Sequence, residues 1–345
     1  MSGPVPGIDR IVALGGGHGL YATLTAMRYL SPDITAIVTV ADDGGSSGRL
    51  RGELNLIPPG DLRMALAALL VAPAALADMD DEQARRAELW GELLQHRFGG
   101  HGALAGHPIG NLLLVGLTGL LGDPIEALKR LAELTQVGGR VLPMSTVPLT
   151  IEADVTGLEA DPRLSRAIRG QVAVATTPGK VRRVRLLPEA PPASVEACAA
   201  IEAADLVVLG PGSWFSSVIP HVLVPDQLAA LSSTSARKML IVNLAPEPGE
   251  TPGFSVERHL HVLHAHADTL RIDEVLVDER SAPAGREREH LARAAALFGA
   301  ELHVGDLAVN GTHVHDPQRV AQMVASVMGV APASPDVPRA RRELA

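Results

Sequence analysis

The residues best able to do chemistry in this chain lie in four short segments that each follow an aliphatic run. The first is Gly15-Gly16-Gly17-His18-Gly19, which separates the aliphatic run Ile8 to Leu14 from a segment with helical spacing, Leu20 to Leu30. Backbone N–H groups of a glycine turn at a helix start can meet phosphate oxygens at the positive helix end. The turn lacks both the P-loop and the G-x-G-x-x-G patterns. We expect phosphate binding here, with a tight turn as the alternative.

The second segment follows the run Ile34 to Val40 and holds two adjacent carboxylates, Asp42 and Asp43. Successive side chains of an extended strand alternate, so only one of the two can face a ligand while the other braces the loop. The inward carboxylate could bind a ribose hydroxyl or a magnesium ion that bridges phosphates. Three more side chains of this segment could bind phosphate, or belong to a solvated turn: Ser46, Ser47 and Arg49.

The remaining segments repeat this design of small and polar residues after a strand. One contains Gly210, Gly212 and Ser213, and the other begins at Asn243. Asn111 introduces a further helix, where it could equally be a ligand or a helix N-cap.

A parallel sheet would bring these segments together, because ligands of such sheets bind beyond the carboxyl ends of the strands. Buried-type runs alternate with helical segments along the chain, which predicts an α/β protein with a Rossmann-like, doubly wound and mainly parallel sheet. The expected strands after the first two cover residues 146–156, 172–176, 182–187, 206–209, 239–244 and 274–277. We expect one domain over residues 8–330, a small helical insertion at 78–98, and a disordered tail at 331–345.

Composition narrows the function further. The chain has 39 acidic and 30 basic residues and a net charge of −9, which argues against nucleic-acid binding. Its single cysteine, Cys198, allows no internal disulfide, and the four histidines between residues 259 and 266 lack an obvious acidic partner for zinc. The longest apolar run, Met64 to Ala77, is shorter than the ~20 residues of a membrane span. We expect a soluble, cytoplasmic homo-oligomer.

Five ordered motifs carry a resemblance to a known family. They are GGGHGL, VADDGGSSGRLR, PPGDLRMAL, GHPIGNLL and LGPGSWFSSVIP, within a resemblance that runs from about Arg10 to Gly329. In these motifs the chain resembles the YvcK family, also known as the gluconeogenesis factor family. That family is related to the 2-phospho-lactate transferases of the CofD group.

The resemblance implies a Rossmann-like fold that binds UDP-N-acetylglucosamine and related UDP-sugars. It further implies a role in cell-wall precursor supply and cell shape during gluconeogenic growth, with a protein of amino-sugar synthesis as partner. The transferase relatives hold a divalent metal, for which the matching residues here are Asp43 and Asp61, and Mg²⁺ is the candidate ion. The chain departs from the family pattern N-x-M-T-Q-P-G-E-T, because Ala245-Pro246-Glu247 stands in place of the Met-Thr-Gln run.

Two functions compete for the same phosphate site. A regulator would bind the UDP-sugar without turnover and shift its own conformation. A metal-dependent transferase would move a phosphate-bearing group, with the metal neutralising phosphate charge. The chain offers no well-placed general base beyond the acidic residues of the second segment, so we favour the regulator. A dinucleotide-dependent oxidoreductase is disfavoured by the glycine spacing.

Overall fold

The structure is a computed structural model that describes residues 8–72, 77, 79–161, 163–247, 250–251 and 253–330. The tail expected at 331–345 lies outside the described residues. No described helix is both long and apolar enough to cross a bilayer.

A seven-stranded, fully parallel sheet forms the centre of the molecule, in the order β10-β9-β8-β7-β1-β2-β3. Its strands are β1 (Arg10–Gly15), β2 (Asp33–Val38), β3 (Arg140–Pro143), β7 (Leu206–Leu209), β8 (Arg237–Ile241), β9 (Glu274–Asp278) and β10 (Glu301–Gly305). The chain order changes direction beside β1, with β2 and β3 on one side and β7 to β10 on the other. This confirms the expected α/β fold and places a topological switch point between β1 and β7. The strand β10 was not foreseen.

The strands read as aliphatic runs because both faces of the sheet are covered. In β1 and β2 the first residue alone is exposed and the other five are buried. Register then fixes where the strands end: Gly15 pairs with Val38, Leu14 with Leu209, and Leu209 with Leu240. The segments that follow β1, β2, β7 and β8 therefore leave the sheet at one edge.

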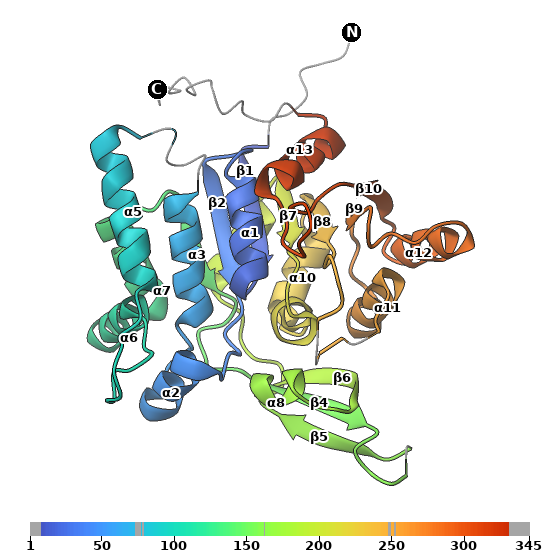
Figure 1. Cartoon of the computed structure of the whole chain (residues 1–345), viewed down its shortest axis with the longest axis horizontal. Coiled ribbons are helices and arrows are strands. Elements are labelled where there is room, and N and C mark those ends of the chain that lie inside the picture. The colour runs from blue at the N-terminus through green and yellow to red at the C-terminus, as the bar shows by residue number, and fades with distance from the viewer. Residues whose placement is uncertain are drawn as a thin grey trace.

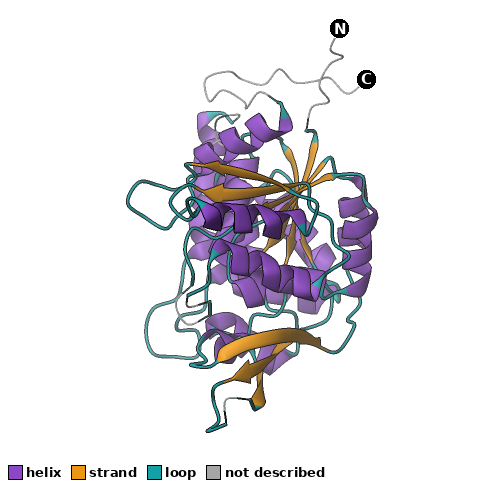
Figure 2. Ribbon diagram, turned by 90° about the vertical axis from the view of Figure 1, so that its right-hand side faces the viewer, coloured by secondary structure: helices purple, strands orange, loops and turns teal. Residues whose placement is uncertain are grey.

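Helices lie on both sides of this sheet (Figure 2). In Figure 1, α1 (Gly17–Met27) lies between α3 (Gly60–Val71) and α13 (Pro317–Met328), and α5 (Asp81–Gln95) packs on α3. The helix expected at 78–98 is α5, at 81–95. The remaining helices are α2 (Gly45–Leu54), α6 (Ile109–Leu121), α7 (Pro124–Thr135), α8 (Gln171–Ala175), α9 (Val195–Ala203), α10 (Pro225–Ser233), α11 (Val256–His266), α12 (Arg286–Ala296), and the short η1 (Trp214–Val218) and η2 (Ile219–Val222).

A second sheet, antiparallel and three-stranded, lies beyond the carboxyl edge of the main sheet (Figure 1). Its order is β5-β4-β6, with β4 (Thr150–Thr156), β5 (Ser165–Arg169) and β6 (Lys180–Leu187). The expected strand at 172–176 is wrong: residues 171–175 form helix α8. The alternating Val-Ala-Val run suits a strand, but the N–H groups of Gln171 and Val172 are bound by the distant Asp43 carboxylate, which caps a helix start.

The start of α1 packs directly on the segment that follows β7. A Cβ atom on Gly19 would lie 1.9 Å from the carbonyl oxygen of Pro211, so only glycine fits at this contact. Gly116 on α6 provides a contrast, since a Cβ atom there would have no neighbour within 4 Å.

We therefore predict opposite effects of two glycine-to-alanine changes. Gly19→Ala should lower the free energy of unfolding by about 2 kcal/mol or more, because the two segments must move apart. Gly116→Ala, the matched control, should raise it by about 0.5 kcal/mol through helix propensity. Urea unfolding followed by circular dichroism measures both, and equal effects would contradict the packing argument.

Candidate functional site

The glycine turn after β1 presents the N-terminus of α1 to a cavity. Gly16 is the N-cap in extended conformation, and no side chain caps the helix there. Gly17 has φ +55°, a left-handed conformation that favours glycine. The N–H of Gly17 donates to the Asp61 carboxyl, while those of His18 and Gly19 have no partner among the described residues. The helix start thus retains free donors and its partial positive charge for an anion.

The cavity in front of this turn has a volume of about 250 Å³. Segments that follow β1, β2 and β7 meet there, as expected for the carboxyl edge of the sheet. Its lining residues are Gly16, Gly17, His18, Gly19, Thr39, Asp42, Asp61, Gln171, Gly212, Ser213, Ser216, Ser217 and Glu247. We refer to it as the phosphate cavity, after the chemistry of the α1 N-terminus.

The two adjacent carboxylates after β2 have different roles. Asp43 accepts hydrogen bonds from the N–H groups of Gln171 (3.0 Å) and Val172 (2.9 Å), one to each oxygen. Asp42 lines the phosphate cavity and accepts the N–H of Gly44 at 2.9 Å. The structure therefore places Asp42, rather than the Asp43 expected from the motif, in one cavity with Asp61. The motif position alone did not distinguish these neighbours.

Asp61 lies in the first turn of α3, at the wall of the phosphate cavity. Burial, and next the negative charge of Asp42, raise the pKa of its carboxyl to about 7. The N–H of Gly17 and the charge of Arg63 act in the opposite direction. Two carboxyl groups that resist joint ionisation are the kind of pair that a divalent cation would stabilise.

Several residues expected to bind ligand are instead engaged within the protein. Asn111 donates to Ser46 Oγ at 3.0 Å and accepts from Arg63 Nε at 3.0 Å, and Ser46 also bonds His107 Nδ1 at 2.8 Å. This buried chain of bonds attaches α2 to α3 and α6. Arg49 donates to the carbonyl of Ala105 at 2.8 Å. Ser47 is buried against Gly60, where a Cβ atom would lie 2.3 Å from its Oγ. None of Ser46, Ser47, Arg49 and Asn111 lines the phosphate cavity.

The segment after β7 contributes through backbone that is clamped by Asn243. The Asn243 side chain accepts the N–H of Gly212 at 2.9 Å and donates to its carbonyl at 2.7 Å. Ser213 lines the cavity and donates to the buried Glu250, which also accepts the N–H of Phe215. Gly210 lies outside the lining. Asn243 thus positions Gly212. Gly212 lines the phosphate cavity, whereas Asn243 lies beside it.

Some lining residues had no signal in the sequence. Gln171 comes from α8, which packs on the second sheet and which the sequence did not predict to reach this edge. Thr39 lies just after β2 and reads as part of an aliphatic run. Glu247 lies where the chain departs from the family pattern, and a lining role could have been suspected there.

A second cavity, of about 460 Å³, adjoins the first and shares His18, Gly19, Gly212 and Glu247 with it. Its other walls are mostly apolar: Ala22, Pro211, Asn243, Leu244, Ala245, Pro246, His313, Val314 and His315. A third, of about 630 Å³, continues past residues 243–246 towards α11 and α12. The phosphate cavity is therefore one end of a longer cleft.

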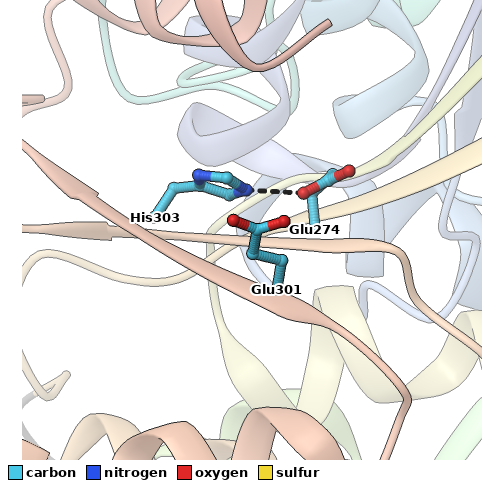
Figure 3. Close-up of side chains that lie close together, drawn as sticks. All are labelled: Glu274, Glu301 and His303. Carbon is cyan, nitrogen blue, oxygen red and sulfur yellow. Dashed lines mark hydrogen bonds and ion pairs between the residues drawn. The ribbon is translucent and has the colours of Figure 1, made fainter.

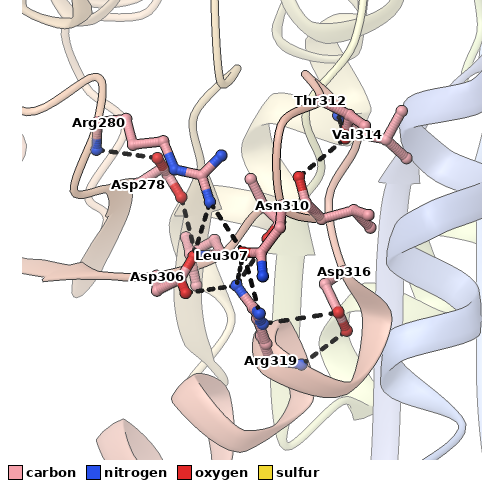
Figure 4. Close-up of polar contacts among 11 residues, drawn as sticks. Asp278, Arg280, Asp306, Leu307, Asn310, Thr312, Val314, Asp316 and Arg319 are labelled. Atoms are coloured by element: carbon pink, nitrogen blue, oxygen red, sulfur yellow. Dashed lines mark hydrogen bonds and ion pairs between the residues drawn. The ribbon is translucent and has the colours of Figure 1, made fainter.

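A polar network holds the wall of the second cavity that comes from residues 306–316 (Figure 4). Arg319, on α13, pairs with Asp306 and donates to the carbonyl of Ala308 at 2.8 Å. The buried Asp278 accepts the N–H groups of Arg280 (2.9 Å) and Leu307 (2.8 Å). These bonds attach the segment to β9 and α13.

One other group of side chains has the composition of a metal site. Ligand atoms of Glu274, Glu301 and His303 lie within 4.8 Å of one another, the only such group within the described ranges (Figure 3). His303 Nε2 lies 2.6 Å from a Glu274 oxygen, and Arg237 pairs with the other oxygen. The group lies at the amino ends of β9 and β10, the sheet edge opposite the phosphate cavity. Because Glu274 is already paired with Arg237 and hydrogen-bonded to His303, we interpret the group as a structural polar cluster.

Comparisons with known proteins agree with this architecture. The family model described as "2-phospho-L-lactate transferase CofD" matches residues 11–316. The chain is 62% identical over 319 residues to the "Putative gluconeogenesis factor" of Mycobacterium tuberculosis strain H37Rv, covering 92% of this chain and 90% of that protein. It is 32% identical to the "Gluconeogenesis factor" of Bacillus subtilis strain 168, covering 92% and 98%. A crystal structure of a UPF0052 family member from Bacillus halodurans superposes with a TM-score of 0.78 at 31% identity, covering 92% and 99%.

The raised pKa of Asp61 predicts how stability depends on pH. A carboxyl whose pKa is raised from 3.8 to about 7 on folding contributes fully to stability below about pH 4, and this contribution is lost as pH rises through 7. Asp61→Asn keeps the group neutral, so it should stabilise the metal-free protein by roughly 2 kcal/mol near pH 8 and have little effect near pH 4. Chemical unfolding at both pH values measures this. Asp268→Asn, at an exposed position, is the control. A pH-independent effect of Asp61→Asn would contradict the assignment.

Proposed function

Because the chain belongs to the gluconeogenesis factor family, with its CofD-type domain, we propose that it is a regulator that binds a UDP-sugar, UDP-N-acetylglucosamine above all. In this proposal the bound sugar nucleotide reports precursor supply, and the protein controls cell-wall precursor synthesis and cell shape during gluconeogenic growth. Its partner would be a protein of amino-sugar synthesis.

The free donors at the α1 N-terminus are the observation that carries this proposal. The N–H groups of His18 and Gly19, together with the Ser217 hydroxyl in the same cavity, offer uncharged hydrogen-bond donors to phosphate. The second cavity adjoins them and has mainly apolar walls, as a nucleobase requires. A molecule with phosphate in the middle and different groups at its two ends fits such a cleft.

The same cleft suits a regulator because it is built from parts of the fold that a ligand would connect. Asp42 precedes α2, Gln171 begins α8 beside the second sheet, and His18 lies in the first turn of α1. A ligand that contacts all three favours the arrangement in which they lie together, and so shifts the population of conformations that a partner meets.

We expect UDP-N-acetylglucosamine at millimolar concentration to raise the melting temperature of the protein by a few degrees. Gly17→Asp should remove this shift, because a carboxylate at the α1 N-terminus repels phosphate. Gly17→Asn is the matched control: asparagine tolerates the same positive φ and has the same size without the charge, so much of the shift should remain. No shift with any UDP-sugar would contradict the proposal.

A second candidate function, a metal-dependent transferase of phosphate-bearing groups, is favoured by the position of Asp42 and Asp61. Both line the cavity that the α1 N-terminus faces. Their oxygens are the ligand type that Mg²⁺ prefers, and two carboxylates leave its other positions for water and phosphate oxygens. Such an ion would neutralise phosphate charge when bound. Of the residues named for the metal in the motif comparison, Asp61 keeps that role and Asp42 replaces Asp43.

Under either function we predict that Mg²⁺ strengthens binding through these carboxylates. Near pH 8, Mg²⁺ should lower the Kd for UDP-N-acetylglucosamine in the wild type by about tenfold, and Asp42→Asn should abolish most of that gain. Isothermal titration calorimetry with and without Mg²⁺ measures the difference, again with Asp268→Asn as control. The transferase becomes the better description if ³¹P spectra of the same mixtures show UMP and sugar phosphate forming, with water as the acceptor, only when Asp42 and Asp61 are intact.

A further inference from the structure

Two side chains lie at the junction of the phosphate cavity and the second cavity. Four residues line both spaces: Gly19 and Gly212, which have no side chain, and His18 and Glu247. The other lining residues belong to one space only. Asp42, Asp61 and Gln171 line the first, and Ala22, Pro211 and Val314 line the second. A ligand that occupies both cavities must therefore pass between His18 and Glu247.

The backbone of Glu247 is held in a compact turn. Its N–H donates to Thr251 Oγ1 at 2.9 Å, and its carbonyl accepts the N–H groups of Glu250 (3.2 Å) and Thr251 (3.0 Å). Thr251 and Glu250 are buried, and Glu250 is itself attached to Ser213. These hydrogen bonds thus fix the position of the Glu247 Cα atom relative to the phosphate cavity.

The Glu247 carboxyl is half-buried, and within the described ranges no hydrogen bond or ion pair engages it. Burial raises the pKa of this carboxyl. A partly desolvated carboxylate without donors is unfavourable, and beside a phosphate it would also repel the ligand. Both costs fall if the ligand brings hydroxyl donors to this position.

A divalent cation is a weaker explanation for this carboxyl. Glu247, Asp42 and Asp61 do not form a group whose ligand atoms all lie within 4.8 Å of one another. Among the described residues, only Glu274, Glu301 and His303 form such a group. Unlike Asp42 and Asp61, Glu247 also lines the second cavity, so it lies towards the apolar end of the cleft.

In a nucleoside diphosphate, the group between the phosphates and the base is the pentose. Its 2′- and 3′-hydroxyls are two neighbouring donors, which match the two oxygens of one carboxylate, and acidic side chains recognise ribose in this way in other α/β folds. We propose that Glu247 binds the ribose hydroxyls and makes the site selective for ribonucleotides over deoxyribonucleotides. This inference rests on the proposed nucleotide function, although it does not depend on which base is bound.

The test compares UDP, ADP and GDP with their 2′-deoxy counterparts by isothermal titration calorimetry. The wild type should bind at least one ribonucleotide about tenfold more tightly than its 2′-deoxy form, because the deoxy form leaves the carboxylate without its donor. Glu247→Gln keeps size and shape but weakens the acceptor, so the preference should fall below about threefold while ribonucleotide binding persists. Glu92→Gln, an equal charge change on the exposed face of α5, should leave the preference unchanged. Melting temperatures without ligand check that both variants are folded.

The outcomes separate this inference from the proposed function. Equal affinity of the wild type for the ribo and deoxy forms, or an unchanged preference in Glu247→Gln, overturns the role of Glu247 and leaves nucleotide binding standing. Binding of ADP or GDP without UDP overturns the UDP-sugar assignment but still tests Glu247. Absence of binding by the wild type to every nucleotide overturns both.

Discussion

Both oxygens of Asp43 accept N–H groups from the start of α8, across 128 residues or more of sequence. This contact joins the second sheet to the segment between β2 and α2, so it decides where Gln171 lies. It also engages one of two adjacent carboxylates, while the other, Asp42, lines the cavity. Without this contact the phosphate cavity would lose the wall that Gln171 provides. The composition of the site thus depends on a single carboxylate that does not line it.

The acidic groups of the cleft work against the proposed binding of phosphate. The α1 N-terminus offers free N–H donors, yet Asp42, Asp61 and Glu247 place acidic groups around the same space. This repulsion is removed if the ligand arrives with a cation and with hydroxyl groups that pair with the acidic side chains. A cation suits the pair Asp42 and Asp61, whose joint ionisation is unfavourable, and hydroxyl groups suit Glu247. The neutral Ser217 hydroxyl in the same cavity then needs only to donate a hydrogen bond to a phosphate oxygen.

The fold and the glycine turn after β1 could be predicted from the sequence, because both depend on local patterns. Aliphatic runs and the glycine turn predicted β1, α1 and the carboxyl edge correctly. Contacts between segments far apart in sequence could not be read from such patterns. Ser46 and Asn111 have the chemistry of ligands, but Arg63 and His107 bind them inside the protein. Residues 172–176 were assigned to a strand because the capping carboxylate lies far away in sequence.

The two adjoining cavities share four lining residues, and each also has walls of its own. The phosphate cavity is formed by residues 16–61, α8 and the segment after β7, while residues 313–315 close the second cavity alone and are attached to α13 through Arg319. Substitution in that last segment can alter what the second cavity admits without disturbing the glycine turn. The lining of the second cavity can therefore vary independently of the glycine turn. Changes at a few C-terminal positions could thus alter the ligand proposed for the second cavity and leave the glycine turn after β1 intact.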